Sequence, residues 1–268
     1  MENTKKIVRN PLLAVGKVFK YEIICGARII VPMYIILLSL SLIIGIFIMN
    51  KDLNFSNNVL DVFKAFIFIL TCIMYFVMFV VTIWQIEKRF KKSLLGDEAY
   101  LNFTLPVTVG EHLWGRYLAD AVWGVSYAVV SVISFMLMVI KGWNKIPEFL
   151  RLFSMHFDEF SDSLHSSVGS FVLMACLNAF MLFMLICVFA YMASTVSNLI
   201  GKHKSLISIL LFIVCFILYS NISNCIFRNL EIYSASYVLL GSFLYNLVWT
   251  IIFSIVTRII FYNRMDLE

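Results

Sequence analysis

The sequence predicts an all-α polytopic membrane protein, and two observations support this fold class. Of the 268 residues, 62% are hydrophobic and only 14% are charged. Soluble domains have about 45–50% apolar and about 25% charged residues, so this chain lacks the polar surface that a soluble fold requires. The apolar residues also gather in six stretches of about twenty, the length that crosses the hydrocarbon core of a bilayer. We treat residues 1–268 as a single transmembrane domain.

The first ordered element is expected over residues 10–28. Asn10 can cap a first helical turn, and Pro11 suits the first helical position because no hydrogen bond is lost there. Apolar residues then recur at three- and four-residue steps, with basic residues on or beside the opposite face. Such a basic amphipathic helix is typical of the membrane interface, where its cations meet anionic headgroups. The alternative is that these residues extend the first span inward.

Six membrane spans are expected after this helix. They cover residues 29–49, 65–86, 118–140, 168–193, 206–226 and 237–261. The fifth is the weakest, because Ser220, Asn221, Ser223 and Asn224 make its second half polar. It is either a full span or a shorter helix followed by a re-entrant turn, which a bilayer tolerates only where protein shields the open backbone.

The distribution of Lys and Arg predicts the orientation of the spans. With both termini in the cytoplasm, 15 of the 21 Lys and Arg residues lie inside and 6 lie outside, as the preference for cytoplasmic cations requires. No charge falls at the middle of a predicted span, since Asp61, Lys64, Asp120 and Arg258 all lie near predicted ends. An ion at mid-membrane costs upwards of ~2.5 kcal/mol and usually marks an ion or proton pathway. This pattern disfavours a carrier driven by an ion gradient.

The outer loop between spans three and four contains an aromatic stripe. Pro147 can begin a helix, and the four phenylalanines that follow at helical spacing share one face. They are Phe149, Phe153, Phe157 and Phe160. Two interpretations are open: a lid at the outer mouth of a pathway, or an aromatic helix lying in the outer headgroup layer.

Motifs for catalysis and nucleotide binding are missing. The run from Gly201 to Ser205 looks like the end of a phosphate-binding loop, but the earlier glycine of that motif would have to stand at Val196. The four histidines are scattered over loops, so no metal site is predicted. We therefore expect no enzyme, no cofactor or metal bound by this chain, and no nucleic-acid partner.

The cytoplasmic loop between spans two and three, residues 94–106, has more structure than a simple connection needs. Gly96 is expected to end the charged helical exit of span two, and Asp97 to cap a short helix that ends before Pro106. Thr108 and Glu111 then have the spacing of a capping box for the helix that leads into span three. Apolar, aromatic and acidic side chains in this loop suit a docking surface.

The run GDEAYLNFTLPVTVGEHLWGRYLAD, residues 96–120, begins in this loop and resembles the segment after the second span of ABC-2 type permeases, the transmembrane subunits of Gram-positive ABC exporters. Those subunits often carry a glycine, acidic residues, a small residue and Tyr-Leu, followed by Thr-Leu-Pro-Val. The architecture of nearly the whole chain is similar too. The resemblance implies an ABC-2, type V exporter-like fold in the bacterial cell (plasma) membrane.

The resemblance also implies partners. Two permease subunits would pair, the second expected to be another copy of this chain. Two cytoplasmic ATP-binding cassette ATPase subunits, which carry ATP and Mg, would dock beneath them. The docking residues that the resemblance implies are Asp97, Glu98, Ala99, Tyr100, Leu101, Phe103, Leu105 and Pro106. The cargo would be hydrophobic or amphipathic peptides, including toxins and bacteriocins, or lipophilic drugs.

By the same resemblance, spans two and five line the cargo pathway and span one contributes to the dimer contact. Candidate cargo-facing residues are then Phe76, Met78, Phe79 and Trp84, with ordinary packing against helices or lipid as the alternative. Two other functions stay open. One is a membrane sensor or immunity protein that binds antimicrobial peptides without transport, and the other is an ion-coupled carrier.

Overall fold

A computed structural model describes residues 11–47, 58–96, 99, 108–138, 168–200, 203–228 and 235–265, and every regular element in these ranges is helical. The elements in order are α1 (Pro11–Phe47), α2 (Asn58–Phe90), the π-helical turn η1 (Lys91–Leu95), α4 (Val109–Met138), α6 (Val168–Ile200), α7 (Lys204–Phe227) and α8 (Ala235–Met265). Six of these helices are long and apolar enough to cross a membrane. The predicted all-α multi-pass membrane protein is confirmed at this level.

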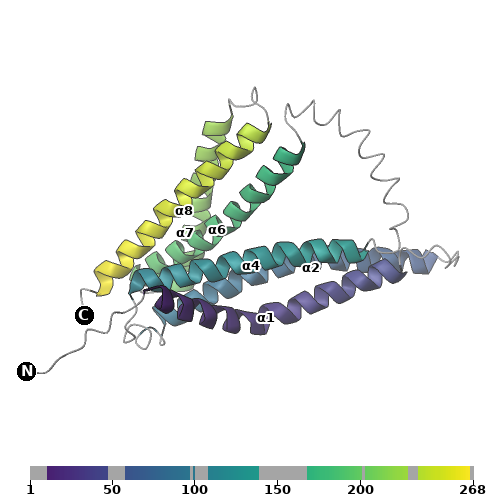
Figure 1. Ribbon diagram of the computed structural model, residues 1–268, viewed down its shortest axis with the longest axis horizontal. Coiled ribbons are helices and arrows are strands. Elements are labelled where there is room, and N and C mark those ends of the chain that lie inside the picture. Colours follow the sequence, from purple (N-terminus) through teal and green to yellow (C-terminus); the bar gives the residue numbers. More distant parts are fainter. Residues whose placement is uncertain are drawn as a thin grey trace, which may run out of the picture.

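The helices form two groups of three. In the first group α1 packs along α4 and α2, and in the second α6 packs along α8 and α7. Figure 1 shows that the groups meet at the end where α1 begins and α8 ends, and diverge towards their other ends. We call the meeting point the shared end.

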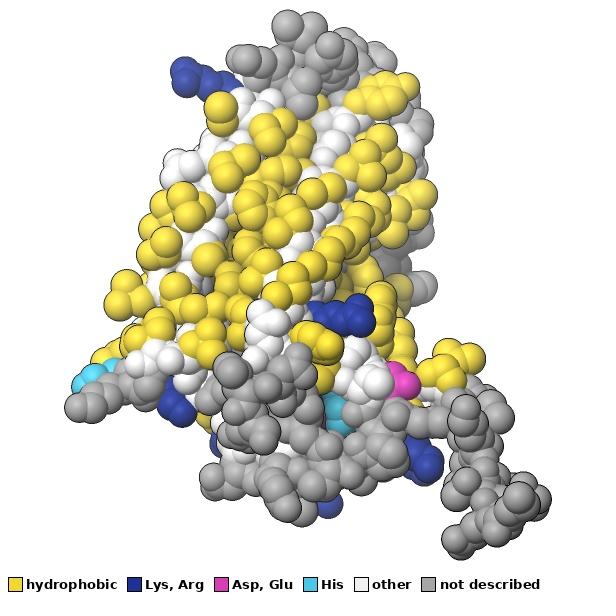
Figure 2. Space-filling model, turned by 90° about the vertical axis from the view of Figure 1, so that its left-hand side faces the viewer, with side chains coloured by type: hydrophobic (Ala, Val, Ile, Leu, Met, Phe, Trp, Pro, Cys, Tyr) yellow, Lys and Arg dark blue, Asp and Glu magenta, His cyan; other side chains and the backbone are white. Residues whose placement is uncertain are grey.

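Basic side chains gather near the shared end. Figure 2 shows apolar side chains over the upright helices and most of the visible Lys and Arg side chains in the lower half of the view. Cations in the helix turns at this end include Lys17, Lys20, Lys88, Arg89, Lys91, Lys92, Arg116 and Lys204, whereas Arg228 follows the opposite end of α7. The side chains of most of the cations that the sequence places outside lie beyond the described residues, so the cation asymmetry and the cytoplasmic placement of the shared end stay predictions.

The bounds of two helices differ from those expected from the sequence. α1 is one continuous helix of 37 residues, so the structure does not separate an interfacial helix over 10–28 from the first span. This is the inward extension that the sequence left open, and the interfacial position of its first turns stays a prediction. α7 continues through Asn221 and Asn224 to Phe227, which excludes the re-entrant turn. Asn221 Nδ2 donates to the carbonyl oxygen of Ile217 at 3.0 Å, so its polar group is satisfied within the helix.

Hydroxyl contacts join the helices of the first group. Its buried core comprises Ile30, Tyr34, Leu37, Met78 and Trp123. Beside this core the Tyr34 and Ser126 hydroxyls lie 2.9 Å apart, and the Tyr75 hydroxyl donates to Ser134 at 2.6 Å. Lipid tails are as apolar as leucine, so such close polar contacts and tight packing, rather than escape from water, hold helices together in a bilayer.

Hydrogen bonds between buried polar side chains likewise join the helices of the second group. Asn246 on α8 is fully buried, and its Nδ2 donates to Asn178 Oδ1 on α6 at 2.7 Å. The Tyr219 hydroxyl on α7 donates to the Asn246 side-chain oxygen. One asparagine thus bonds to both neighbouring helices, which fixes their rotation about their own axes.

The two groups meet through a buried aromatic and aliphatic cluster, which we call the junction cluster. It comprises Ile86, Phe90, Leu94, Leu113, Phe183, Cys187, Tyr191 and Phe261. Gly124 on α4 makes the close approach possible, since a Cβ at this position would lie 2.7 Å from the ring of Phe183. Phe183 is the cluster residue nearest the beginning of α6.

Candidate functional site

The described flanks of the loop between α2 and α4 agree with the sequence prediction. α2 passes into the π-helical turn η1, which ends at Gly96 in an extended conformation (φ −105°, ψ −162°). The backbone amide of Ala99 donates to the carbonyl oxygen of Gly96 at 2.9 Å, which closes one turn. The predicted helix end at Gly96 is confirmed. Single π-helical turns are rare and are often found at functional sites.

The predicted capping box at the start of α4 is also confirmed. The backbone amide of Thr108 donates to Glu111 Oε2 at 2.8 Å, and the backbone amide of Glu111 donates to Thr108 Oγ1 at 3.4 Å. The reciprocal pair satisfies two amides that the first turn would otherwise leave without partners. Both ends of the loop are therefore anchored to helices by local chemistry.

Most of the predicted docking residues lie outside the described residues. These are Asp97, Glu98, Tyr100, Leu101, Phe103, Leu105 and Pro106, and only Ala99 is described, as a partly buried helical residue. The phenylalanines of the outer loop, Phe149, Phe153, Phe157 and Phe160, also lie outside the described residues.

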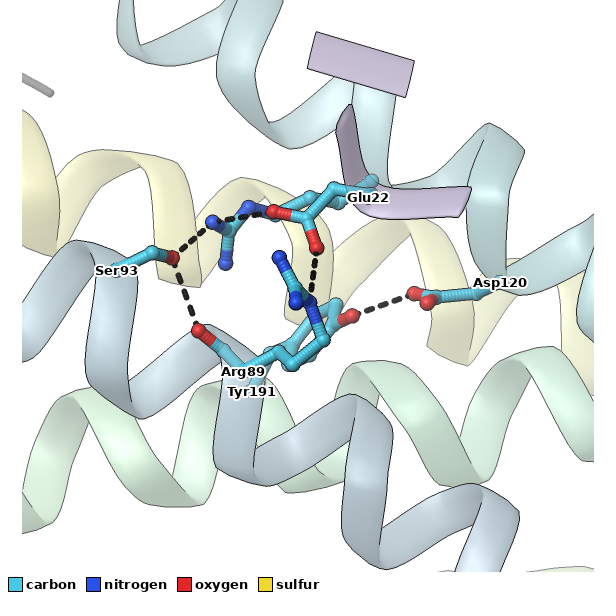
Figure 3. Close-up of polar contacts among 6 residues, drawn as sticks. Glu22, Arg89, Ser93, Asp120 and Tyr191 are labelled. Atoms are coloured by element: carbon cyan, nitrogen blue, oxygen red, sulfur yellow. Dashed lines mark hydrogen bonds and ion pairs between the residues drawn. The ribbon is translucent and has the colours of Figure 1, made fainter. Parts of the chain in front are cut away.

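A buried ion network ties both flanks of the loop to α1. Glu22 on α1 accepts from Arg89 Nε on α2 at 2.7 Å through Oε2, and from an Arg116 terminal nitrogen on α4 at 2.9 Å through Oε1. Arg116 also donates to the Ser93 hydroxyl on η1, which in turn donates to the carbonyl oxygen of Arg89 at 2.9 Å. Figure 3 shows these side chains converging from separate helices. We call this set the Glu22 network.

Tyr191 continues the polar contacts into the second helix group. Its hydroxyl donates to Asp120 Oδ2 on α4 at 2.6 Å (Figure 3), and its ring stacks on Phe90 with centroids 4.1 Å apart. The guanidinium of Arg116 lies 5.5 Å from the Phe90 ring centroid. Phe90 therefore contacts both the Glu22 network and the residue that bonds to Asp120.

The buried charges of the Glu22 network and Asp120 balance one another and are shielded from solvent. Arg116 and Asp120 are each 4% exposed and Glu22 is 7% exposed. A buried charge is tolerated only with partners, and removing one partner costs about 3–5 kcal/mol because the other stays buried and unpaired. Glu22 on α1 forms ion pairs with Arg89 on α2 and with Arg116 on α4, so its carboxylate fixes the position of α4 relative to α2.

Sequence reasoning missed the Glu22 network, although a signal was present. Glu22 is the single acidic residue within the 37 residues of α1. An isolated acid in a long apolar helix is a candidate functional or pairing residue. α4 begins at Val109, so Asp120 lies about three turns inside the helix, and the expectation that no charge falls at the middle of a span stays a prediction.

A small cavity lies beside these charges. Its volume is about 20 Å³, enough for about one water molecule, and Glu22, Gln85, Arg116 and Asp120 are among its lining residues. Gln85 Oε1 and Arg116 Nε are buried, and neither has a hydrogen-bond partner among the described residues. The site therefore offers one more acceptor and one more donor to a small polar molecule.

A larger apolar groove lies between α2 and α7, with α6 as its floor. Its volume is about 410 Å³, within the range of about 300–1,000 Å³ that is usual for ligand pockets. Phe79 and Trp84, two of the predicted cargo-facing residues, line it. Met78 instead lies in the core of the first group, 1% exposed, and Phe76 is 69% exposed and does not line the groove.

Within the described ranges, no three His, Cys, Asp or Glu side chains lie close enough together to hold a metal ion. No family model, curated protein or solved structure matches this chain.

Proposed function

We propose that this chain is the permease subunit of an ATP-driven ABC exporter that moves hydrophobic or amphipathic peptides, or lipophilic drugs, out of a bacterial cell. Two separate ATPase subunits dock on the loop between α2 and α4, and a second copy of the chain completes the pathway. The resemblance of residues 96–120 to ABC-2 type permeases motivates the proposal.

The observation that carries the proposal is the way both flanks of this loop are tied together. η1 precedes the loop and α4 follows it, and Arg116 on α4 donates to Ser93 on η1 as well as to Glu22. A force applied to the loop thus moves the ends of α2 and α4 as one unit. A loop that served only as a connection would need no buried ion network behind it.

From the loop, the contacts lead to both helix groups. Glu22 connects the flanks to α1, and the bond from Tyr191 to Asp120 connects α4 to α6. The groove between α2 and α7 lies on the boundary between the two groups. A displacement of the flanks would therefore change the shape of this groove, which is what coupling between ATPase and cargo requires.

The test is assembly and stimulated hydrolysis. The full chain is co-expressed with each candidate ABC ATPase of its genome, and the complex is assayed for ATPase activity with and without amphipathic peptides. We expect Asp97→Ala and Tyr100→Ala to weaken assembly or abolish the stimulation. Tyr237→Ala, which removes a 70% exposed aromatic side chain at the opposite end of α8, is the control and should change neither. If both loop variants retain assembly and stimulation, the docking assignment is wrong.

One observation favours a second candidate, an ion-coupled carrier. Glu22 and Asp120 are buried carboxylates inside helices that are long and apolar enough to cross a membrane, and such groups often mark ion or proton pathways. Both have protein partners, which favours a structural role. Proteoliposomes that contain only this chain distinguish the two candidates, because a carrier moves cargo under an imposed proton gradient without any ATPase.

A further inference from the structure

The groove between α2 and α7 has apolar walls and one polar end. Its apolar lining residues are Phe79, Val80, Ile83, Trp84, Ile186, Ala190, Ile209, Phe212 and Phe216. Among the described lining residues only Glu87 and Ser208 add polar groups, and they lie together, because the Ser208 hydroxyl donates to Glu87 Oε1 at 3.4 Å. An occupant of this groove is therefore apolar along most of its length and polar at one end.

The polar end carries a net positive charge. Glu87 is already neutralised by Lys91, whose Nζ lies 2.6 Å from Glu87 Oε1. Lys88 and Lys204 remain, and neither forms an ion pair with a described carboxylate. Lys88 Nζ lies 4.7 Å from the ring centroid of Trp84, which lines the groove. Lys204 begins α7 one turn before Ser208, where the positive end of the helix dipole adds to its charge.

The arrangement of these groups matches the layers of a bilayer leaflet. Tryptophan and lysine are the residues that anchor helix ends at the headgroup level, and Trp84 is 51% exposed beside Lys88. The apolar part of the groove extends from this level along α2 to Phe79, away from the shared end. A molecule with a negative headgroup and an acyl chain fits both parts at once.

We propose that this groove binds an anionic phospholipid, with the phosphate between Lys88 and Lys204 and one acyl chain along Phe79, Phe212 and Phe216. A soluble phosphate compound would leave the apolar walls uncovered, and a neutral lipid would leave the two lysines unpaired. The site is a property of this chain alone and does not depend on the proposed export function. A bound lipid covers Phe79 and Trp84, so an amphipathic cargo that enters the groove has to displace it.

The first test compares two lipids that differ only in the headgroup. The detergent-purified full chain is titrated with phosphatidylglycerol or phosphatidylcholine of identical acyl chains, and bound lipid is counted by native mass spectrometry. We expect phosphatidylglycerol to be retained more strongly. The double variant Lys88→Gln/Lys204→Gln should weaken its binding by about fivefold for each lysine, since one cation near an anionic surface contributes ~1 kcal/mol.

A matched control separates the groove from general surface charge. Arg228→Gln removes an exposed cation at the opposite end of α7, far from the groove's polar end, and should leave the titration unchanged. The site is located with phosphatidylglycerol that carries a brominated acyl chain, a contact quencher of tryptophan fluorescence. Trp84→Phe should remove most of the saturable quenching. Equal retention of the two lipids, an equal loss of binding in Arg228→Gln, or unchanged quenching in Trp84→Phe would each overturn the proposal.

Discussion

Replacing Glu22 by glutamine tests whether the buried ion network holds the shared end together. The substitution keeps the size of the side chain but removes the charge that pairs with Arg89 at 2.7 Å and with Arg116 at 2.9 Å. Arg116 has only 4% of its side chain exposed to bulk solvent, whereas Arg89 is 19% exposed. Loss of one partner of a buried pair costs about 3–5 kcal/mol, which lowers the melting temperature of a chain of this size by roughly 6–20 °C.

The assay is thermal unfolding in one detergent, with Glu87→Gln as the matched control. Glu87 also pairs with a lysine near the same end, but its side chain is 24% exposed and its partner Lys91 is one turn away on the same helix. Such a pair contributes about 0.3–0.5 kcal/mol, so the control should lose about 1–2 °C. Adding Arg116→Gln to Glu22→Gln should recover part of the loss, because the stranded buried cation is then gone. If Glu22→Gln loses no more than Glu87→Gln, the network does not stabilise the fold.

Two further predictions concern helix contacts and caps. Gly124→Ala places a methyl group 2.7 Å from Phe183 and should destabilise the fold by about 1–3 kcal/mol. The control Gly16→Ala has no atom within 4 Å of the new Cβ, so it should be neutral or stabilising by up to about 1 kcal/mol. Equal melting temperatures for the two variants would contradict the packing of α4 on α6. Thr108→Ala removes the capping box and should lower the free energy of unfolding by about 1 kcal/mol, and Thr108→Ser should restore most of that stability. An unchanged melting temperature in the alanine variant would show that this cap does not stabilise α4.

Local features of the chain were predictable from the sequence. The helix end at Gly96 and the reciprocal bonds between Thr108 and Glu111 depend on residues within a few positions of one another, so residue type and spacing determine them. The number and approximate position of the six apolar helices follow from hydropathy alone. These are the features for which the sequence carries direct physical information.

Pairings between helices were not predictable. Glu22 is separated from Arg116 by 94 positions, and their contact depends on how α1 and α4 are rotated about their axes. In a membrane helix apolar residues face both lipid and protein, so hydrophobic periodicity does not show that rotation. The same limit applies to the candidate pathway residues. Met78 and Phe79 are neighbours in sequence, yet one lies in the core and the other lines the groove, because successive helical residues point about 100° apart.

The divergence of the two helix groups has a mechanical consequence. Phe183, in contact range of Gly124, is the junction residue furthest from the shared end along α6. From Phe183 the helix extends about 12 Å to Tyr191 in one direction and about 21 Å to Gly169 in the other, at 1.5 Å per residue. If α6 pivots as a rigid helix about Phe183, the part towards Gly169 is nearly twice as long as the part towards Tyr191. A shift of about 1 Å at the Tyr191–Asp120 bond would therefore move the far end of α6 by about 2 Å, so a small movement at the shared end is amplified where the groups separate (Figure 1).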